Sequence, residues 1–129
     1  MKRIAINGLG RIGRMVRPEF EEGIRTLVIR APIPDGAISD IVADLKKSVT
    51  ASEVNAAFKS ASEGHMKGIL GYTEDELVSA DIIDDPHSAI IHALSTVVVQ
   101  GSMVKVQAWY DNEFGYSKRL LDMIEKLPL

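Results

Sequence analysis

Val97-Val98-Val99-Gln100-Gly101-Ser102-Met103-Val104-Lys105-Val106 is the stretch that decides the fold. Two runs of β-branched and apolar residues flank a short polar segment that contains a glycine, which predicts a β-hairpin continuing to Tyr110. A further strand is expected over residues 69–73, where apolar residues precede a threonine. The second half of the chain is therefore expected to form a sheet.

A helix is predicted over residues 50–63. Thr50 and Glu53 have the spacing of a capping box, in which each side chain accepts a hydrogen bond from the backbone of the other. Apolar residues then recur on one helical face, and Gly64 is placed to end the helix.

A last helix is expected near residues 113–126. Asp111 or Asn112 can cap it, and Pro128 follows its end. Leu120, Leu121 and Ile124 form its apolar face. The segment 74–95 between the two predicted strand regions fits neither periodicity.

The chain opens with a strand, a glycine loop and the start of a helix. Arg3-Ile4-Ala5-Ile6 is apolar and β-prone, and Gly8, Gly10 and Gly13 follow it directly. Pro18 then interrupts the expected helix, because proline removes a backbone donor. A second strand is expected over residues 24–29, and Pro32 to Gly36 reads as a turn.

These elements predict an α/β to α+β fold. We expect a Rossmann-type βα start, a mixed or mainly antiparallel sheet over residues 24–110, and the two helices covering that sheet. Three segments are expected: an N-terminal piece of a dinucleotide-binding domain (1–23), a remnant of a substrate and oligomerisation domain (24–110), and the C-terminal helix (111–129).

Composition narrows the classes of partner. The 129 residues are 46% hydrophobic and 26% charged, with a formal net charge of −3. This balance suits a globular protein and offers no basic stripe for nucleic acid and no apolar run long enough for a membrane span. We therefore expect a cytoplasmic protein. The chain has no cysteine, so a thiol nucleophile is excluded for the chain as it stands.

The loop Gly8-Leu9-Gly10-Arg11-Ile12-Gly13 fits the dinucleotide fingerprint. In this reading the glycines allow the turn and the close approach of a pyrophosphate, and the amides of Arg11 and Ile12 face the phosphates. The spacing alone leaves a plain glycine-rich turn equally open. Asp35 lies at the distance where the fingerprint places an acidic ribose ligand.

Five motifs closely resemble glyceraldehyde-3-phosphate dehydrogenases of the NAD-dependent, phosphorylating type. They occur in the order of that family, the first at its N-terminus and the others in its C-terminal part: Ile6–Arg14, Pro32–Gly36, Val54–Lys59, Lys67–Glu74 and Trp109–Ser117. The first motif and the rest do not join as they do in the family, which indicates an internally deleted or truncated form.

The resemblance implies a glycolytic oxidoreductase that converts an aldehyde to an acyl phosphate with NAD, in subunits that associate through the sheet. It also implies that Gly8, Gly10, Arg11, Ile12, Gly13, Asn112 and Tyr116 contact the cofactor, the last two near the nicotinamide. An alternative interpretation of Asn112 is that its side chain caps the last helix and contacts no cofactor. Asp35 resembles a catalytic-domain loop residue of the family, so the resemblance disfavours it as the ribose ligand.

The same resemblance implies what the chain lacks. The family's cysteine nucleophile, catalytic histidine, phosphate ligands and acidic ribose ligand have no counterpart here. No catalytic residue is therefore assigned, and NAD binding is expected to be weak or lost.

The spacing of the remaining polar residues indicates neither a metal site nor a catalytic site. His65, His87 and His92 do not pair on one helical face, and the acidic cluster at 81–85 lacks the pattern of a calcium loop. No metal is expected. Three hypotheses remain: an active dehydrogenase, which the missing cysteine opposes, a weak non-catalytic NAD-binding module, and a structural or homo-oligomeric fragment.

Overall fold

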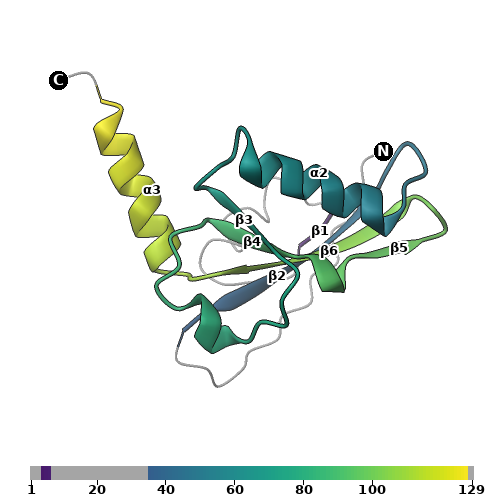
Figure 1. The fold of residues 1–129 in the computed structure, drawn as a ribbon, viewed down its shortest axis with the longest axis horizontal. Helices are drawn as coiled ribbons and strands as arrows, with labels where there is room; N and C mark the ends of the chain where they lie inside the picture. Colours follow the sequence, from purple (N-terminus) through teal and green to yellow (C-terminus); the bar gives the residue numbers. More distant parts are fainter. Residues whose placement is uncertain (1–3, 7–34, 128–129) are drawn as a thin grey trace.

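The computed structural model describes residues 4–6 and 35–127 of the chain. The glycine loop, the strand expected over 24–29 and most of the turn from Pro32 lie outside these residues. Within them the chain forms one mixed sheet, a long helix packed on one face of the sheet and a second helix at its end (Figure 1).

The sheet is built around one long central strand. Strand β6 (Met103–Tyr110) pairs antiparallel with β2 (Ala37–Asp44) on one side, and with β4 (Ala89–His92) and β5 (Val97–Val99) on the other. The order across the sheet is β1-β2-β6-β4-β3, with β5 beside β6. The expected mixed sheet is thus confirmed.

The two ends of the sheet differ in pairing. Strand β1 (Ile4–Ile6) runs antiparallel to β2, whereas β3 (Leu70–Thr73) runs parallel to β4. The first strand of a Rossmann-type unit pairs in parallel with the strand that follows its helix. The pairing of β1 with β2 is not that arrangement, and the Rossmann-type start stays a prediction.

The predicted hairpin between Val97 and Tyr110 is confirmed. Val97 pairs with Lys105 and Val99 with Met103, and the chain turns between them. Gln100 and Gly101 both take positive φ, 51° and 77°. Glycine adopts this conformation without steric cost, which explains its place in the turn.

Helix α2 (Ala51–Glu63) matches its prediction at both ends. The amide of Glu53 donates to Thr50 Oγ1 (3.2 Å), and the amide of Thr50 donates to Glu53 Oε2 (2.7 Å). These two bonds form the capping box, and the amide of Gly64 closes the helix on the carbonyls of Ser60 and Ala61. Local chemistry therefore fixes both ends.

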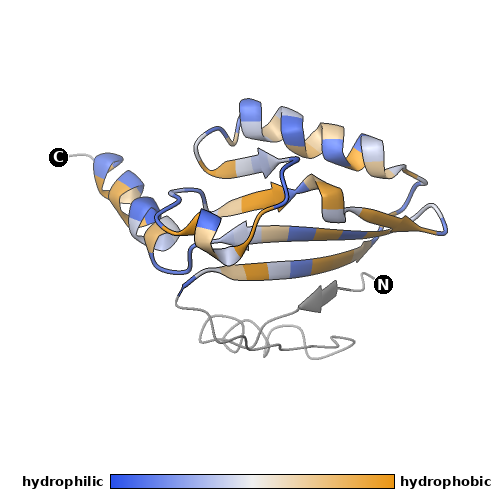
Figure 2. Ribbon diagram, turned by 60° about the horizontal axis from the view of Figure 1, so that its bottom comes forward, coloured by the Kyte–Doolittle hydropathy of each residue, from blue (hydrophilic) through white to orange (hydrophobic). Residues whose placement is uncertain are grey.

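The core lies between α2 and the sheet. Its buried members come from three strands: Leu70, Ile91, Val104, Val106 and Ala108. Val54, Phe58 and Ala61 of α2 pack on them. In Figure 2 both α2 and the long strands carry hydrophilic residues between hydrophobic ones, as expected of elements with one buried face.

Helix α3 (Phe114–Glu125) exists as predicted, but it does not cover the sheet. It leaves the end of β6 and projects away from the body of the described chain (Figure 1). Its predicted apolar residues are open to solvent, with Leu120, Leu121 and Ile124 about half exposed or more. The prediction that this helix covers the sheet is wrong, because its apolar stripe finds no described strand beneath it.

The ambiguous segment 74–95 contains short elements. Two 3-10 helices, η2 (Ser79–Ile82) and η3 (Ala93–Ser95), flank β4. Ile82 is fully buried, and its side chain would lie 3.1 Å from a Cβ placed at Gly36. This close approach and the φ of 92° at Gly36 explain the glycine in the turn before β2. None of the described helices is long and apolar enough to cross a bilayer.

Candidate functional site at the start of the C-terminal helix

Asp111 organises the chain between β6 and α3. Its side chain is buried, and its Oδ1 accepts hydrogen bonds from the amides of Glu113 (2.8 Å) and Phe114 (2.7 Å). Its Oδ2 accepts from the amide of Asp84 (2.9 Å), in the loop before β4. Asp111 therefore binds the first amides of the helix from two residues before its N-cap position, and it ties the start of the helix to a distant loop. The N-cap position itself is Glu113, and not Asp111 or Asn112 as predicted.

The ionised form of Asp111 is favoured. Burial acts to raise the pKa of this carboxyl, but the hydrogen bonds from the amides of Phe114, Glu113 and Asp84 together outweigh burial. The pKa of Asp111 is accordingly lowered from its ordinary value. A negative charge is thus held at the N-terminal end of α3, where the helix dipole also favours it.

The two predicted nicotinamide contacts lie beside this cap. Asn112 is exposed in the turn before α3, and Tyr116 is 61% exposed in the first turn of the helix. Trp109, at the end of β6, is partly buried, and its indole Nε1 has no hydrogen-bond partner. Asn112 and Tyr116 are therefore accessible to a ligand, with an indole close by in the chain.

The predicted phosphate contacts cannot be placed beside them. Gly8, Gly10, Arg11, Ile12 and Gly13 lie outside the described residues, so whether the loop and the start of α3 meet is untested. Asp35 lies in the turn before β2, where its Oδ1 accepts from the amide of Gly36 (2.6 Å). The turn is confirmed for these two residues, and a ribose contact of Asp35 stays untested.

The three aspartates of the acidic cluster at 81–85 each bind a different partner. Asp81 accepts from the amide of Val78 (2.8 Å), and Asp84 donates its own amide to Asp111. Asp85 Oδ1 faces His87 Nδ1 at 2.8 Å. In the ranges that the structure describes, no three acidic or histidine side chains are grouped as metal ligands would be.

The pair formed by Asp85 and His87 is a site that sequence reasoning missed. Asp85 Oδ1 also accepts from the backbone amide of His87 (2.8 Å). One carboxylate oxygen therefore contacts both the backbone nitrogen and the ring nitrogen Nδ1 of His87. With Nδ1 held in this way, Nε2 is the ring nitrogen left for another partner. The signal in the sequence is the spacing of two residues between an aspartate and a histidine in a loop, which a helical periodicity does not reveal.

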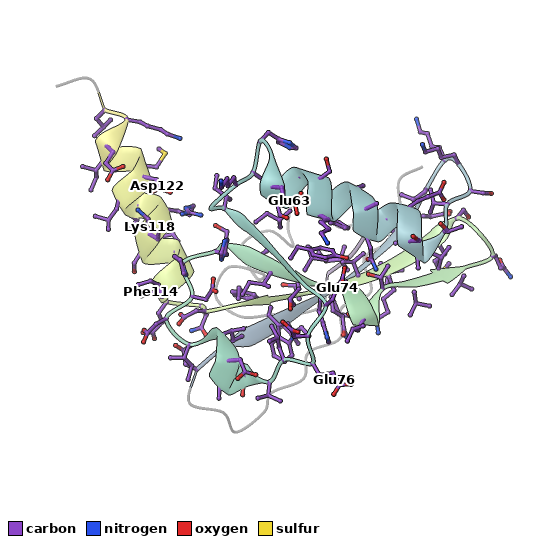
Figure 3. The ribbon with its side chains drawn as sticks, in the orientation of Figure 1. Glu63, Glu74, Glu76, Phe114, Lys118 and Asp122 are labelled. Atoms are coloured by element: carbon purple, nitrogen blue, oxygen red, sulfur yellow. The ribbon has the colours of Figure 1, made fainter. Side chains whose placement is uncertain are left out.

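Helix α3 is attached to the same loop. Arg119 donates through Nη1 to the Gly68 carbonyl (3.3 Å) and to Ser88 Oγ (3.2 Å). Its Nη2 lies 2.8 Å from Asp122, which also pairs with Lys118 (Figure 3). The start of α3 is therefore fixed to the loops before β3 and β4, although its C-terminal half projects outward.

The comparisons with known proteins agree on one family. The family model described as glyceraldehyde 3-phosphate dehydrogenase, C-terminal domain, matches residues 8–112. This match begins within the segment predicted to open a dinucleotide-binding domain, so the boundary at residue 23 remains a prediction.

Curated relatives match most of this chain. Glyceraldehyde-3-phosphate dehydrogenase 1 of Bacillus subtilis (strain 168) is 49% identical over 116 residues, which are 90% of this chain and 35% of the relative. The Geobacillus stearothermophilus enzyme is 47% identical over 116 residues, with the same shares covered. The Haloarcula vallismortis protein is 46% identical over 118 residues, 92% of this chain and 35% of its own length.

The chain thus spans about a third of the length of the curated relatives it matches. The matched family model covers well over half of the chain and agrees with the mixed sheet and its packed helix. This chain belongs to the family of the glyceraldehyde 3-phosphate dehydrogenase C-terminal domain.

Proposed function

We propose that this chain is a non-catalytic association module of the glyceraldehyde-3-phosphate dehydrogenase family, which pairs with a second copy of itself through its sheet. The observation that carries the proposal is a set of exposed apolar side chains on the sheet face opposite α2, where charged residues also lie. Side chains alternate across a strand, so residues next to the core positions of β6 point to this second face.

The second face carries exposed apolar side chains on three strands. Ile38 on β2 is 37% exposed, Met103 on β6 is 46% exposed, and Val97 and Val99 on β5 are each 47% exposed. They share the face because Ile38 pairs with Trp109, and the two valines pair with Lys105 and Met103. Val97, Val99 and Met103 lie together at the hairpin end of this face, and exposed apolar side chains grouped in this way are typical of protein interfaces.

The same face contains an ion pair that can serve self-association. Lys105 Nζ lies 3.2 Å from Asp40 Oδ2, while Asp40 Oδ1 is buried without a hydrogen-bond partner. A two-fold dimer buries the same patch on both copies, so each charge of the pair is matched by its opposite. An oligomer assembled through this sheet is also what the family resemblance implies.

The proposal that the chain is inactive alone rests on its composition. The family reaction, as the resemblance implies it, proceeds through a cysteine thiolate, and the 129 residues contain no cysteine. Three of the described serine hydroxyls are already hydrogen-bonded: Ser62 and Ser95 donate to nearby carbonyls, and Ser88 accepts from Arg119. The substrate, the glycolytic role and the cytoplasmic location of the family are carried over as expectations only.

Weak NAD binding is a second candidate, favoured by the exposure of Asn112 and Tyr116 beside Trp109. Titration of NAD while following Trp109 fluorescence tests it, since this is the only tryptophan of the chain. A saturable change that disappears in Asn112→Ala and persists in Glu125→Gln supports binding at this place. An unchanged signal at millimolar NAD eliminates this candidate.

Sedimentation velocity tests the association proposal. Met103→Lys places a charge beside Val99 at the hairpin end of this face, and burying an unpaired charge is costly, so the dimer should dissociate. Val78→Lys is the matched control, because Val78 is 60% exposed and lies in a loop outside the sheet. A monomeric wild-type chain at all concentrations, or equal effects of both variants, would contradict the proposal.

A further inference from the structure

We propose that the outer edge of β3 is a binding site for an extended peptide segment, which adds to the sheet as a further strand and places an aromatic side chain over Gly71. This site is separate from the sheet face discussed above and does not depend on it. Its elements are an open sheet edge and a cavity that surrounds that edge.

Strand β3 is the last strand of the sheet on its side. It pairs only with β4 among the described strands, in parallel register from Leu70 with Ala89 to Thr73 with His92. An edge strand presents its outward amides and carbonyls without partners. Among the described residues one of these groups is used locally, since the amide of Leu70 donates to the carbonyl of Met66 (2.9 Å).

Strand β3 lacks three of the usual protections of a sheet edge and keeps one, its short length of four residues. Natural edges carry charged residues, proline or a bulge that prevents another strand from pairing. The sequence of β3 is Leu-Gly-Tyr-Thr, with no charge and no proline, and its register with β4 is continuous. The strand is short, which limits what can add to it to a few residues.

A cavity of about 570 Å³ lies at this edge. On the α2 side it is lined by Ser62, Glu63 and Tyr72, and Figure 3 shows Glu63 at the end of the helix that faces α3. On the other side of the sheet it is lined by Asp85, His87 and Ile90. A cavity with walls from both faces must enclose the edge between them, which is where an added strand would run.

Gly71 lies in the middle of this edge. A Cβ at Gly71 would be 3.1 Å from Ile90 Cγ1 and 3.4 Å from the Cγ of His87, so the glycine brings these two side chains close to the strand. An aromatic residue on a neighbouring strand commonly packs over a glycine of this kind. Here the ring would lie beside the His87 imidazole, which Asp85 holds in place through Nδ1 at 2.8 Å.

The rim of the cavity favours a peptide over a small anion or cation. Glu63 and Lys67 lie on it with opposite charges, and the Asp85 carboxylate lies 2.8 Å from Nδ1 of the His87 ring. The wall between them is apolar, with buried Leu70 and Ile90. Main-chain hydrogen bonds would give the affinity, and the pocket beside Gly71 would select the side chain.

The test is an NMR titration of the isotope-labelled full chain with the blocked peptide acetyl-Lys-Thr-Phe-Thr-Val-Lys-amide. The amides of residues 70–73 should shift, and the peptide should bind at least about tenfold more weakly when alternate backbone amides are N-methylated. Equal binding of the two peptides, shifts confined to other strands, or no shift at millimolar peptide would overturn the proposal.

Two variants locate the site independently. Ser62→Trp fills the α2 side of the cavity and should reduce peptide binding by about tenfold or more. Ser60→Trp is the control, because Ser60 lies on the exposed side of the same helix. If Ser62→Trp does not fold, the binding of the unmodified and N-methylated peptides to the wild-type chain still tests whether a strand adds to β3. Concentration-dependent shifts of residues 70–73 without peptide would assign the edge to a second copy and overturn the proposal.

Discussion

Gly115 and His87 are in direct backbone contact. A Cβ at position 115 would lie 2.6 Å from the His87 carbonyl oxygen, a distance that the first turn of α3 cannot accommodate without moving. The helix begins against the loop that holds Asp85, and only a residue without a side chain permits this approach. This contact and the Asp111 cap together set the direction in which α3 leaves the sheet.

Gly115→Ala should therefore destabilise the chain, despite the better helix propensity of alanine. Overpacking of this kind costs about 1–3 kcal/mol, which exceeds the gain of roughly 1 kcal/mol from removing a helical glycine. Urea unfolding measures the difference. Gly68→Ala is the comparison, because a Cβ there meets nothing within 4 Å and only its φ of 77° opposes the change. A stabilised Gly115→Ala variant would show that the contact is not tight.

Asp111→Asn should lower the free energy of unfolding by about 1–3 kcal/mol, the range for leaving a buried hydrogen-bonding group unsatisfied. The carboxylate accepts from three amides, whereas asparagine offers one oxygen and turns its own NH₂ donor toward the others. Urea unfolding measures this change. Asp81→Asn, at an exposed carboxylate, is the control and should change stability much less.

Stability should decrease in acid through Asp111. The pKa of this group is lowered in the folded chain, so its contribution is complete above the pKa of an unfolded aspartate, about 3.9, and is lost as pH falls through the lowered folded value. Urea midpoints from about pH 6 to about pH 2 should fall more steeply for the wild type than for Asp111→Asn. Parallel profiles would show that Asp111 is not the group responsible.

Thr50→Ala should destabilise α2 by about 1 kcal/mol, because the amide of Glu53 loses its capping partner. Thr50→Ser keeps the hydroxyl and should retain most of the stability. Circular dichroism during urea unfolding distinguishes the two variants. Equal losses would attribute the effect to the threonine methyl group and not to the cap.

The chain alone should produce no NADH above background from glyceraldehyde 3-phosphate, NAD and phosphate. The reason is the absence of any cysteine to form the covalent intermediate that the family resemblance implies. The assay needs protein free of host dehydrogenase, and a preparation of Asn112→Ala serves as the matched blank. Turnover that increases with wild-type chain and exceeds this blank would contradict the prediction.

Local chemistry explains which parts of the fold could be predicted. The ends of α2 depend on capping bonds that Thr50, Glu53 and Gly64 make with nearby residues of the same helix, and the hairpin depends on its turn. Strand β4 is different, since Ala89–His92 is too short to show a period and becomes a strand through β3 and β6, which are distant in sequence. Local reasoning cannot detect such pairing.

In the candidate site, too, local patterns could be predicted and contacts between distant segments could not. Asp111 was predicted as a cap because a cap is a local pattern, and Asn112 and Tyr116 depended on the family resemblance. The bond from Asp84 to Asp111 joins two loops, and the contact of Gly115 with His87 joins a helix to a loop. Neither has a signal in the sequence, because both depend on how α3 meets the end of the sheet.

Sedimentation velocity of the wild-type chain beside Met103→Lys tests the central proposal most directly. Association through the sheet face of Ile38, Val97, Val99 and Met103 predicts a wild-type dimer whose dissociation constant rises at least about tenfold in the variant, with Val78→Lys unchanged. A wild-type chain that stays monomeric, or a Met103→Lys chain that associates as strongly as the wild type, would contradict it.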